Sequence, residues 1–255
     1  MLGFLQQQKK PKTMKKTILP ILTAALLASV ASTQAQSLLR ITEAMSSSGV
    51  GGTPDWFELT NLGNTAAVIT GWKVDDSSYG TPSTAQIALN GITSIGAGES
   101  VVFFETTAAN LTGAWATDLT NFRNFWGGLN GVQVGYYGGS GVGLSSSGDG
   151  LVVFNSSGAE ATSRVSFGAA TAGYSFNFTW DNAGALTSAL NALSAEGVNG
   201  AWKVNAAFGG TGTPIDNIAG PGTITTAAVP EPSSVALLGL GFLALLGVRG
   251  LNRKA

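Results

Sequence analysis

Two acidic residues, Glu43 and Glu58, are the first candidates for chemistry in this sequence. Each lies in a short stretch where apolar and polar residues alternate, Leu39 to Met45 for the first and Asp55 to Asn61 for the second. Paired carboxylates are the groups with which glycoside hydrolases cleave sugar chains, one as acid and one as base or nucleophile. A weakly hydrolytic activity on polysaccharide is therefore one function to weigh.

A second group of candidates consists of aspartates that could bind Ca²⁺ through oxygen. Asp75 and Asp76 precede two serines, and Asp149 lies in a later glycine-rich stretch. Their spacing does not match an EF-hand loop, and Asp-Ser clusters commonly cap turns instead. We predict no metal and no other cofactor, with Ca²⁺ at these three aspartates as the weaker alternative.

The 255 residues include no cysteine and no histidine. This composition excludes disulfides, thiol nucleophiles, the Ser-His-Asp triad and the usual zinc ligands. It also removes the most common general base. These absences favour a protein without enzymatic activity. Sugar binding needs none of these groups, and an aromatic platform for it is an alternative that would use Trp115, Trp126 or Trp180.

Charge is unevenly distributed along the chain, although the total is only −1. Residues 37–228 contain five basic and thirteen acidic side chains, which gives this part a net charge of −8. A phosphate-binding surface needs clustered Lys and Arg. We therefore expect no nucleic acid among the partners.

The elements that must position these residues are short strands. Residues 37–208 combine Gly, Ser, Thr, Val and aromatic residues with turn signals about every ten positions, a pattern typical of a sandwich or barrel. We predict an all-β domain over 37–208 with one short helix at 119–126, whose aromatic residues recur at helical spacing. An Asn90-Gly91 hairpin is expected between two further strands. Residues 209–228 are rich in Pro, Gly and Thr and predict a flexible linker.

The N-terminus has the three parts of a secretory signal peptide. Five lysines between residues 9 and 16 precede an apolar run at 18–30, and small residues follow at 31–35. We expect a signal helix within residues 1–35 and cleavage between Ala35 and Gln36. Met14 is a plausible true start, because the signal from that residue onward is complete and compact.

Residues 229–255 form a tail of three parts. A stiff segment opens it, because each proline fixes its own φ and favours extended geometry before it: Val229, Pro230, Glu231 and Pro232. Residues 235–248 are an uncharged apolar run that predicts a short transmembrane helix. At about 1.5 Å per residue this run spans roughly 21 Å, less than the hydrocarbon core of about 30 Å. Three basic residues are expected on the cytoplasmic side: Arg249, Arg253 and Lys254.

This tail resembles the PEP-CTERM sorting signal of exported bacterial proteins, with Pro230-Glu231-Pro232 as its signature. The resemblance implies recognition and cleavage by an exosortase, a membrane transpeptidase, after passage through the general secretion machinery. It also implies an envelope of the Gram-negative type and a frequent association with exopolysaccharide. The two ends agree, because both place their positive charge in the cytoplasm and the domain between them outside.

The domain resembles the lamin-tail domain, an immunoglobulin-like β-sandwich. The similarity rests on residues 40–45, on 55–61 followed by 70–74, and on 96–102. It implies that Glu43 and Glu58 lie on paired strands near turn backbone and have a structural role. It does not imply an enzyme, and residues 106–147 and the end after Phe167 depart from the pattern.

The sequence therefore predicts a non-enzymatic exported protein that passes through an inner-membrane intermediate to the cell envelope or the extracellular matrix. Its β-sandwich would be a structural or adhesion module. The alternative is a module that binds, or weakly hydrolyses, the exopolysaccharide of the matrix.

Overall fold

The computed structural model describes residues 36–76, 86–106, 113, 115–138, 142–181 and 184–223. These residues form strands and one 11-residue helix, α2 (Trp115–Phe125), with a short 3-10 turn, η2 (Phe208–Gly210). The signal region 1–35 and residues 224–255, which include the whole tail, lie outside the described residues, and so do the helices predicted there. No helix among the described residues is long and apolar enough to cross a membrane.

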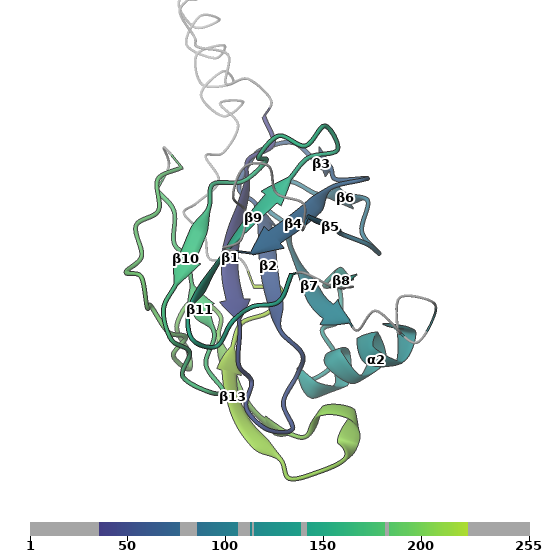
Figure 1. The fold of residues 1–255 in the computed structure, drawn as a ribbon, viewed down its shortest axis with the longest axis vertical. Coiled ribbons are helices and arrows are strands. Elements are labelled where there is room, and N and C mark those ends of the chain that lie inside the picture. Colours follow the sequence, from purple (N-terminus) through teal and green to yellow (C-terminus); the bar gives the residue numbers. More distant parts are fainter. Residues whose placement is uncertain are drawn as a thin grey trace, which may run out of the picture. The chain divides into compact units, whose positions relative to one another are not determined.

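Two main β-sheets make up the fold (Figure 1). The larger sheet has the order β11-β1-β2-β7-β8, in which only the β7–β8 pair is parallel. Its strands are β1 (Leu39–Met45), β2 (Trp56–Asn61), β7 (Ser100–Thr106), β8 (Val134–Gly138) and β11 (Phe176–Asn177). The smaller sheet has the order β10-β9-β4-β5 and is antiparallel. Its strands are β4 (Lys73–Asp76), β5 (Ile87–Ala88), β9 (Asp149–Phe154) and β10 (Val165–Phe167).

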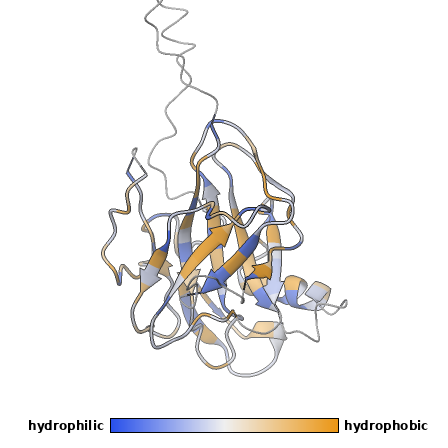
Figure 2. Ribbon diagram, turned by 45° about the horizontal axis from the view of Figure 1, so that its top comes forward, coloured by the Kyte–Doolittle hydropathy of each residue, from blue (hydrophilic) through white to orange (hydrophobic). Residues whose placement is uncertain are grey.

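The main hydrophobic core contains residues from both sheets. Successive side chains of a strand point to opposite faces, and Phe57 and Leu59 of β2 therefore share this core with Val101 and Phe103 of β7. The smaller sheet contributes apolar side chains of β4, β9 and β10: Val74, Leu151, Val153, Val165 and Phe167. Figure 2 shows hydrophobic residues concentrated in these central strands. The arrangement confirms a mostly β fold consistent with an immunoglobulin-like domain.

The second face of the larger sheet is covered as well. Trp56, Val102 and Phe104 pack against Phe122 and Phe125 of α2 in a second core. Burial on both faces explains why β7 reads Ser-Val-Val-Phe-Phe with no alternation. The predicted helix exists but begins at Trp115, before the predicted 119, and it covers this second face of the sheet.

The predicted hairpin around Asn90-Gly91 is wrong. β5 pairs with β4, whereas β6 (Ser94–Ile95) pairs with β3 (Ala67–Val68). Between them, Asn90 exchanges two backbone hydrogen bonds with Tyr136 of β8, at 2.9 and 3.0 Å. The backbone groups that a local hairpin would pair are therefore used by strands distant in sequence.

The predicted linker also needs correction. Within residues 209–228, β13 (Ile215–Ala219) forms an antiparallel pair with β12 (Trp202–Ala206), with Trp202 opposite Ala219. Ala219 is fully buried in the second core, and Trp202 packs against that core. The folded domain therefore continues to Thr223. The sequence of β13, Ile-Asp-Asn-Ile-Ala, is only weakly apolar and did not indicate a strand, because most of the burial of β13 comes from β12.

Candidate functional site

A β-bulge brings the two candidate glutamates together. Ile41 pairs with Leu59, but the next pair is Glu43 with Glu58, so Thr42 is an extra residue in β1. Without this bulge, Glu43 would lie opposite Phe57 and point into the main core. The extra residue moves Glu43 to the face of β2 that carries Glu58, and the two carboxylates become cross-strand neighbours.

The segment that leaves the domain donates backbone hydrogen bonds to both carboxylates. The N–H of Gly220 donates to Oε1 of Glu43 at 2.9 Å, and the N–H of Gly222 donates to Oε2 of Glu58 at 2.7 Å. We call these four residues, Glu43, Glu58, Gly220 and Gly222, the C-terminal clasp. Its two glutamates lie on β1 and β2, and its two glycines lie at the last described turn, a few residues before the tail.

Hydroxyl groups add further hydrogen bonds to Oε1 of each carboxylate. Ser175 and Ser194 donate to Oε1 of Glu43. On the other carboxylate, Thr42 donates to Oε1 of Glu58 at 2.5 Å. Buried carboxylates need such partners because an unsatisfied polar group in a low-dielectric interior is costly. These hydrogen bonds from strands and turns distant in sequence fit a structural use of both carboxylates.

Burial raises the pKa of both carboxyl groups. For Glu43 the hydrogen bonds from Ser175, Gly220 and Ser194 oppose the effect of burial on the pKa but do not cancel it. Burial raises the pKa of Glu58 well above its ordinary value, and the neighbouring charge of Glu43 raises it further. The side chains are 2% and 0% exposed. A substrate therefore cannot reach them in this structure, and they are not arranged as a glycoside hydrolase pair.

Replacing Glu58 with glutamine is expected to stabilise the protein at about pH 8 and to have no such effect near pH 4. A raised pKa means that the folded state binds the proton more tightly than the unfolded state does. Stability is therefore lost as the pH rises from the ordinary pKa through the raised one. The glutamine amide cannot ionise, so the variant does not lose stability in this way. Its oxygen can still accept from the N–H of Gly222, and its NH₂ can donate to Thr42.

Urea unfolding of the wild type and the Glu58→Gln variant at both pH values measures this effect. Glu160→Gln is the matched control because that carboxylate is exposed and bonded to Arg164. A Glu58→Gln variant that is less stable than the wild type at pH 8, or equally shifted at both pH values, would contradict the prediction.

The three aspartates considered for Ca²⁺ are each engaged with backbone. Oδ1 of Asp75 accepts from the N–H of Asp76 at 3.0 Å, and Oδ2 of Asp149 accepts from the N–H of Ser145 at 2.7 Å. Asp76 accepts a long bond of 3.4 Å from Gly143. In the part of the chain that the structure describes, no group of three or more Asp, Glu, His or Cys could hold a metal ion.

Sequence reasoning missed a different pair of acids at the end of the larger sheet. Asp55 precedes β2 and Glu105 lies in β7, and the N–H of Glu105 donates to the backbone oxygen of Asp55 at 2.7 Å. Burial, followed by the charge of Glu105, raises the pKa of Asp55 from 3.8 to about 7. The register of β2 with β7 brings them together, and no local sequence signal indicates it.

The aromatic platform for sugar does not form. Trp126 is 2% exposed, and Trp180 is 6% exposed with its indole N–H donating to the Ile41 oxygen at 2.8 Å. Trp115 is half-buried and stacks on Tyr136 with ring centroids 4.6 Å apart. Two of the three tryptophans are thus core residues, so together they offer no exposed row.

The predicted processing residues lie almost wholly outside the described part of the chain. This holds for Ala35 and for the whole sorting tail, both the Val229-Pro230-Glu231-Pro232 segment and the basic residues Arg249, Arg253 and Lys254. Gln36 is described, and its N–H donates to Oδ1 of Asn64 at 2.9 Å. The residue that would follow the predicted cut is therefore already attached to the domain.

Two family models match this chain. The Lamin Tail Domain model matches residues 32–169, and the model of the PEP-CTERM protein-sorting motif matches residues 228–254. Both resemblances stated from the sequence are confirmed. The comparisons with curated proteins and with solved structures gave no match. The first matched range contains Glu43 and Glu58 but ends before β11, so the donors Gly220 and Gly222 lie beyond it.

Proposed function

Because the chain belongs to the lamin tail domain family and carries a PEP-CTERM sorting motif, we propose that it is a non-enzymatic exported protein sorted by an exosortase. Export through the general secretion machinery gives an inner-membrane intermediate, which the apolar run 235–248 anchors. Cleavage in the sorting signal then delivers the β-sandwich to the cell envelope or the extracellular matrix. There the domain acts as a structural or adhesion module.

The observation that carries this proposal is the sorting motif itself, at residues 228–254. The structure shows how the end of the folded domain is held before this motif. The clasp fixes the backbone at Gly222, and Thr223 is the last described residue, which leaves residues 224–228 as the connection to Val229. The eleven residues 224–234 separate Thr223 from the apolar run and span at most about 40 Å when fully extended. We therefore expect the folded domain to lie within that distance of the membrane surface while the signal is recognised.

The role of the domain follows from how its polar groups are used. Both lamin-tail glutamates bind the protein's own backbone and hydroxyls, and both families that match are non-catalytic. The buried pair thus attaches residues 220–222 to β1 and β2 of the larger sheet. This suits a module whose C-terminus is connected to another structure.

Removing residues 229–255 is expected to redirect the protein from the envelope to the soluble fraction. The deletion leaves the clasp intact, because the clasp ends at Gly222. A second variant, Pro230→Ala/Glu231→Ala/Pro232→Ala, keeps the apolar run and the basic end, and its uncleaved precursor should accumulate in the membrane. Cell fractionation with mass spectrometry of the mature C-terminus measures both effects. Equal distribution of all three proteins with an unprocessed C-terminus would refute the sorting proposal.

A further inference from the structure

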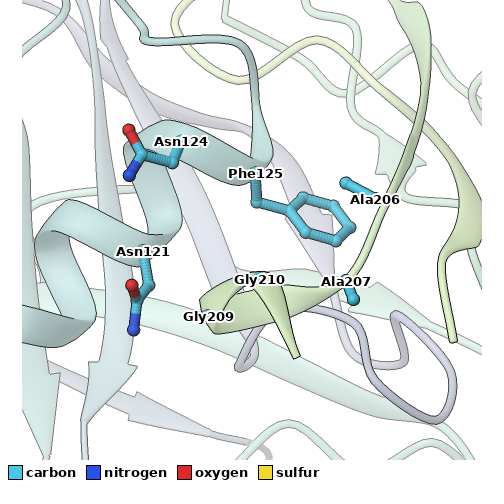
Figure 3. A pocket seen from close by; sticks show the side chains of 7 residues that line it. All are labelled: Asn121, Asn124, Phe125, Ala206, Ala207, Gly209 and Gly210. Atoms are coloured by element: carbon cyan, nitrogen blue, oxygen red, sulfur yellow. The ribbon is translucent and has the colours of Figure 1, made fainter. Parts of the chain in front are cut away.

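A pocket lies on the domain where α2 meets the turn after β12, and it is separate from the clasp. Figure 3 shows Phe125 extending from α2 toward Ala206 and Ala207, with Asn121 beside Gly209. The cavity volume is about 260 Å³. Pockets for drug-sized ligands have about 300 to 1,000 Å³. This pocket therefore suits a smaller ligand, or one unit of a larger chain.

The lining chemistry is polar and uncharged. Two side-chain amides, of Asn121 and Asn124, lie beside the ring of Phe125, and no Lys, Arg, Asp or Glu lines the cavity. Neither amide has a hydrogen-bond partner among the residues that the structure describes. Each amide offers two donors and an acceptor. A ligand that both donates and accepts, and that carries no charge, fits this lining best.

The opposite wall consists of backbone. Gly209 and Gly210 have φ of 72° and 68°, a left-handed conformation that side-chain-bearing residues rarely adopt. A Cβ at Gly209 would lie 3.5 Å from Nδ2 of Asn121 and would occupy space beside that amide. The glycines therefore form the turn and keep the wall open next to the amide.

We propose that this pocket, between Asn121 and Asn124 of α2 and the Gly209–Gly210 turn, binds one neutral sugar unit of a polysaccharide. Sugar hydroxyls donate and accept at once and thus match the two amides, which lie next to the buried ring of Phe125. An anionic ligand would find no cation in the lining, within a domain of net negative charge. This sugar site would be independent of sorting, because it lies on the folded domain and not on the sorting motif.

Affinity electrophoresis of the protein purified from its producing cells tests the proposal. The gels contain dextran, a β-1,3-glucan or a galactomannan as neutral probes, and alginate as the anionic one. We expect retardation by at least one neutral polysaccharide and none by alginate. The Asn121→Ala/Asn124→Ala variant should bind that probe about tenfold more weakly, because it loses the hydrogen bonds of two amides.

Thr120→Ala is the matched control, because Thr120 lies on the same helix and its hydroxyl bonds to the Ala116 oxygen outside the pocket. Alanine favours helix at all three positions, so the fold should survive, and circular dichroism checks this. Loss of retardation in the double variant with retention in the control supports the site. Retardation by no neutral probe, by alginate alone, or equally for the wild type and the double variant overturns it.

Discussion

Replacing Glu43 with alanine is expected to lower the free energy of unfolding by about 3 kcal/mol, because it removes one member of a buried hydrogen-bonded network. The N–H of Gly220 would lose its acceptor inside the protein, and the hydroxyls of Ser175 and Ser194 would keep only the hydrogen bond between them in place of those to Glu43. An unsatisfied buried group costs about 1 to 3 kcal/mol. Relief of repulsion with Glu58 offsets part of this loss. Urea unfolding at neutral pH measures the difference.

The same variant should also open the end of the domain. Without the Glu43 carboxylate, the N–H of Gly220 loses the hydrogen bond that attaches residues 220–223 to the sheet. Limited proteolysis should therefore cut within residues 220–223 more rapidly. Glu196→Ala is the matched control, since this glutamate is exposed and lies two residues from Ser194. If Glu43→Ala changed stability by less than about 0.5 kcal/mol, the range of ordinary surface changes, the clasp would have no structural role.

Replacing Asp55 with asparagine is expected to stabilise the protein at about pH 8 by roughly 2 kcal/mol. The pKa of Asp55 rises from 3.8 to about 7 on folding, mainly because the carboxyl is buried and secondly because Glu105 lies near it. Such a difference corresponds to about 4 kcal/mol, which we reduce because part of the side chain still contacts solvent. Asparagine retains an acceptor for the N–H of Leu144 that bonds to Asp55.

Because folding raises the pKa of Asp55, the stabilisation by Asp55→Asn depends on pH. Between about pH 4 and pH 7 the folded protein binds a proton that the unfolded chain has released, so the wild type loses stability as the pH rises through this window. The gain from Asp55→Asn should therefore vanish near pH 4 and be complete by about pH 8. Asp181→Asn, at an exposed position outside this acidic region, is the control. A gain that persists at pH 4 would contradict the assignment to ionisation.

The two ends of the chain and the central strands could be predicted from continuous stretches of sequence. Lysines, an apolar run and small residues predict a signal peptide from one continuous stretch, and the Pro-Glu-Pro tail is likewise continuous. The strands around Phe57 and Phe103 carry enough apolar residues to be recognised alone. The absence of His and Cys is independent of folding altogether. The sequence alone therefore identified the family, the mostly β class and the sorting motif.

The tertiary structure decided where the polar residues meet. The bulge at Thr42 depends on the register of β1 against β2, and it alone places Glu43 beside Glu58. The donors Gly220 and Gly222 follow β13, which a local interpretation assigned to a linker because its burial comes from β12 and the second core. Asp55 and Glu105 likewise meet only through the β2–β7 pairing. Apolar periodicity shows which residues are buried, but pairing between distant strands determines which of them are neighbours.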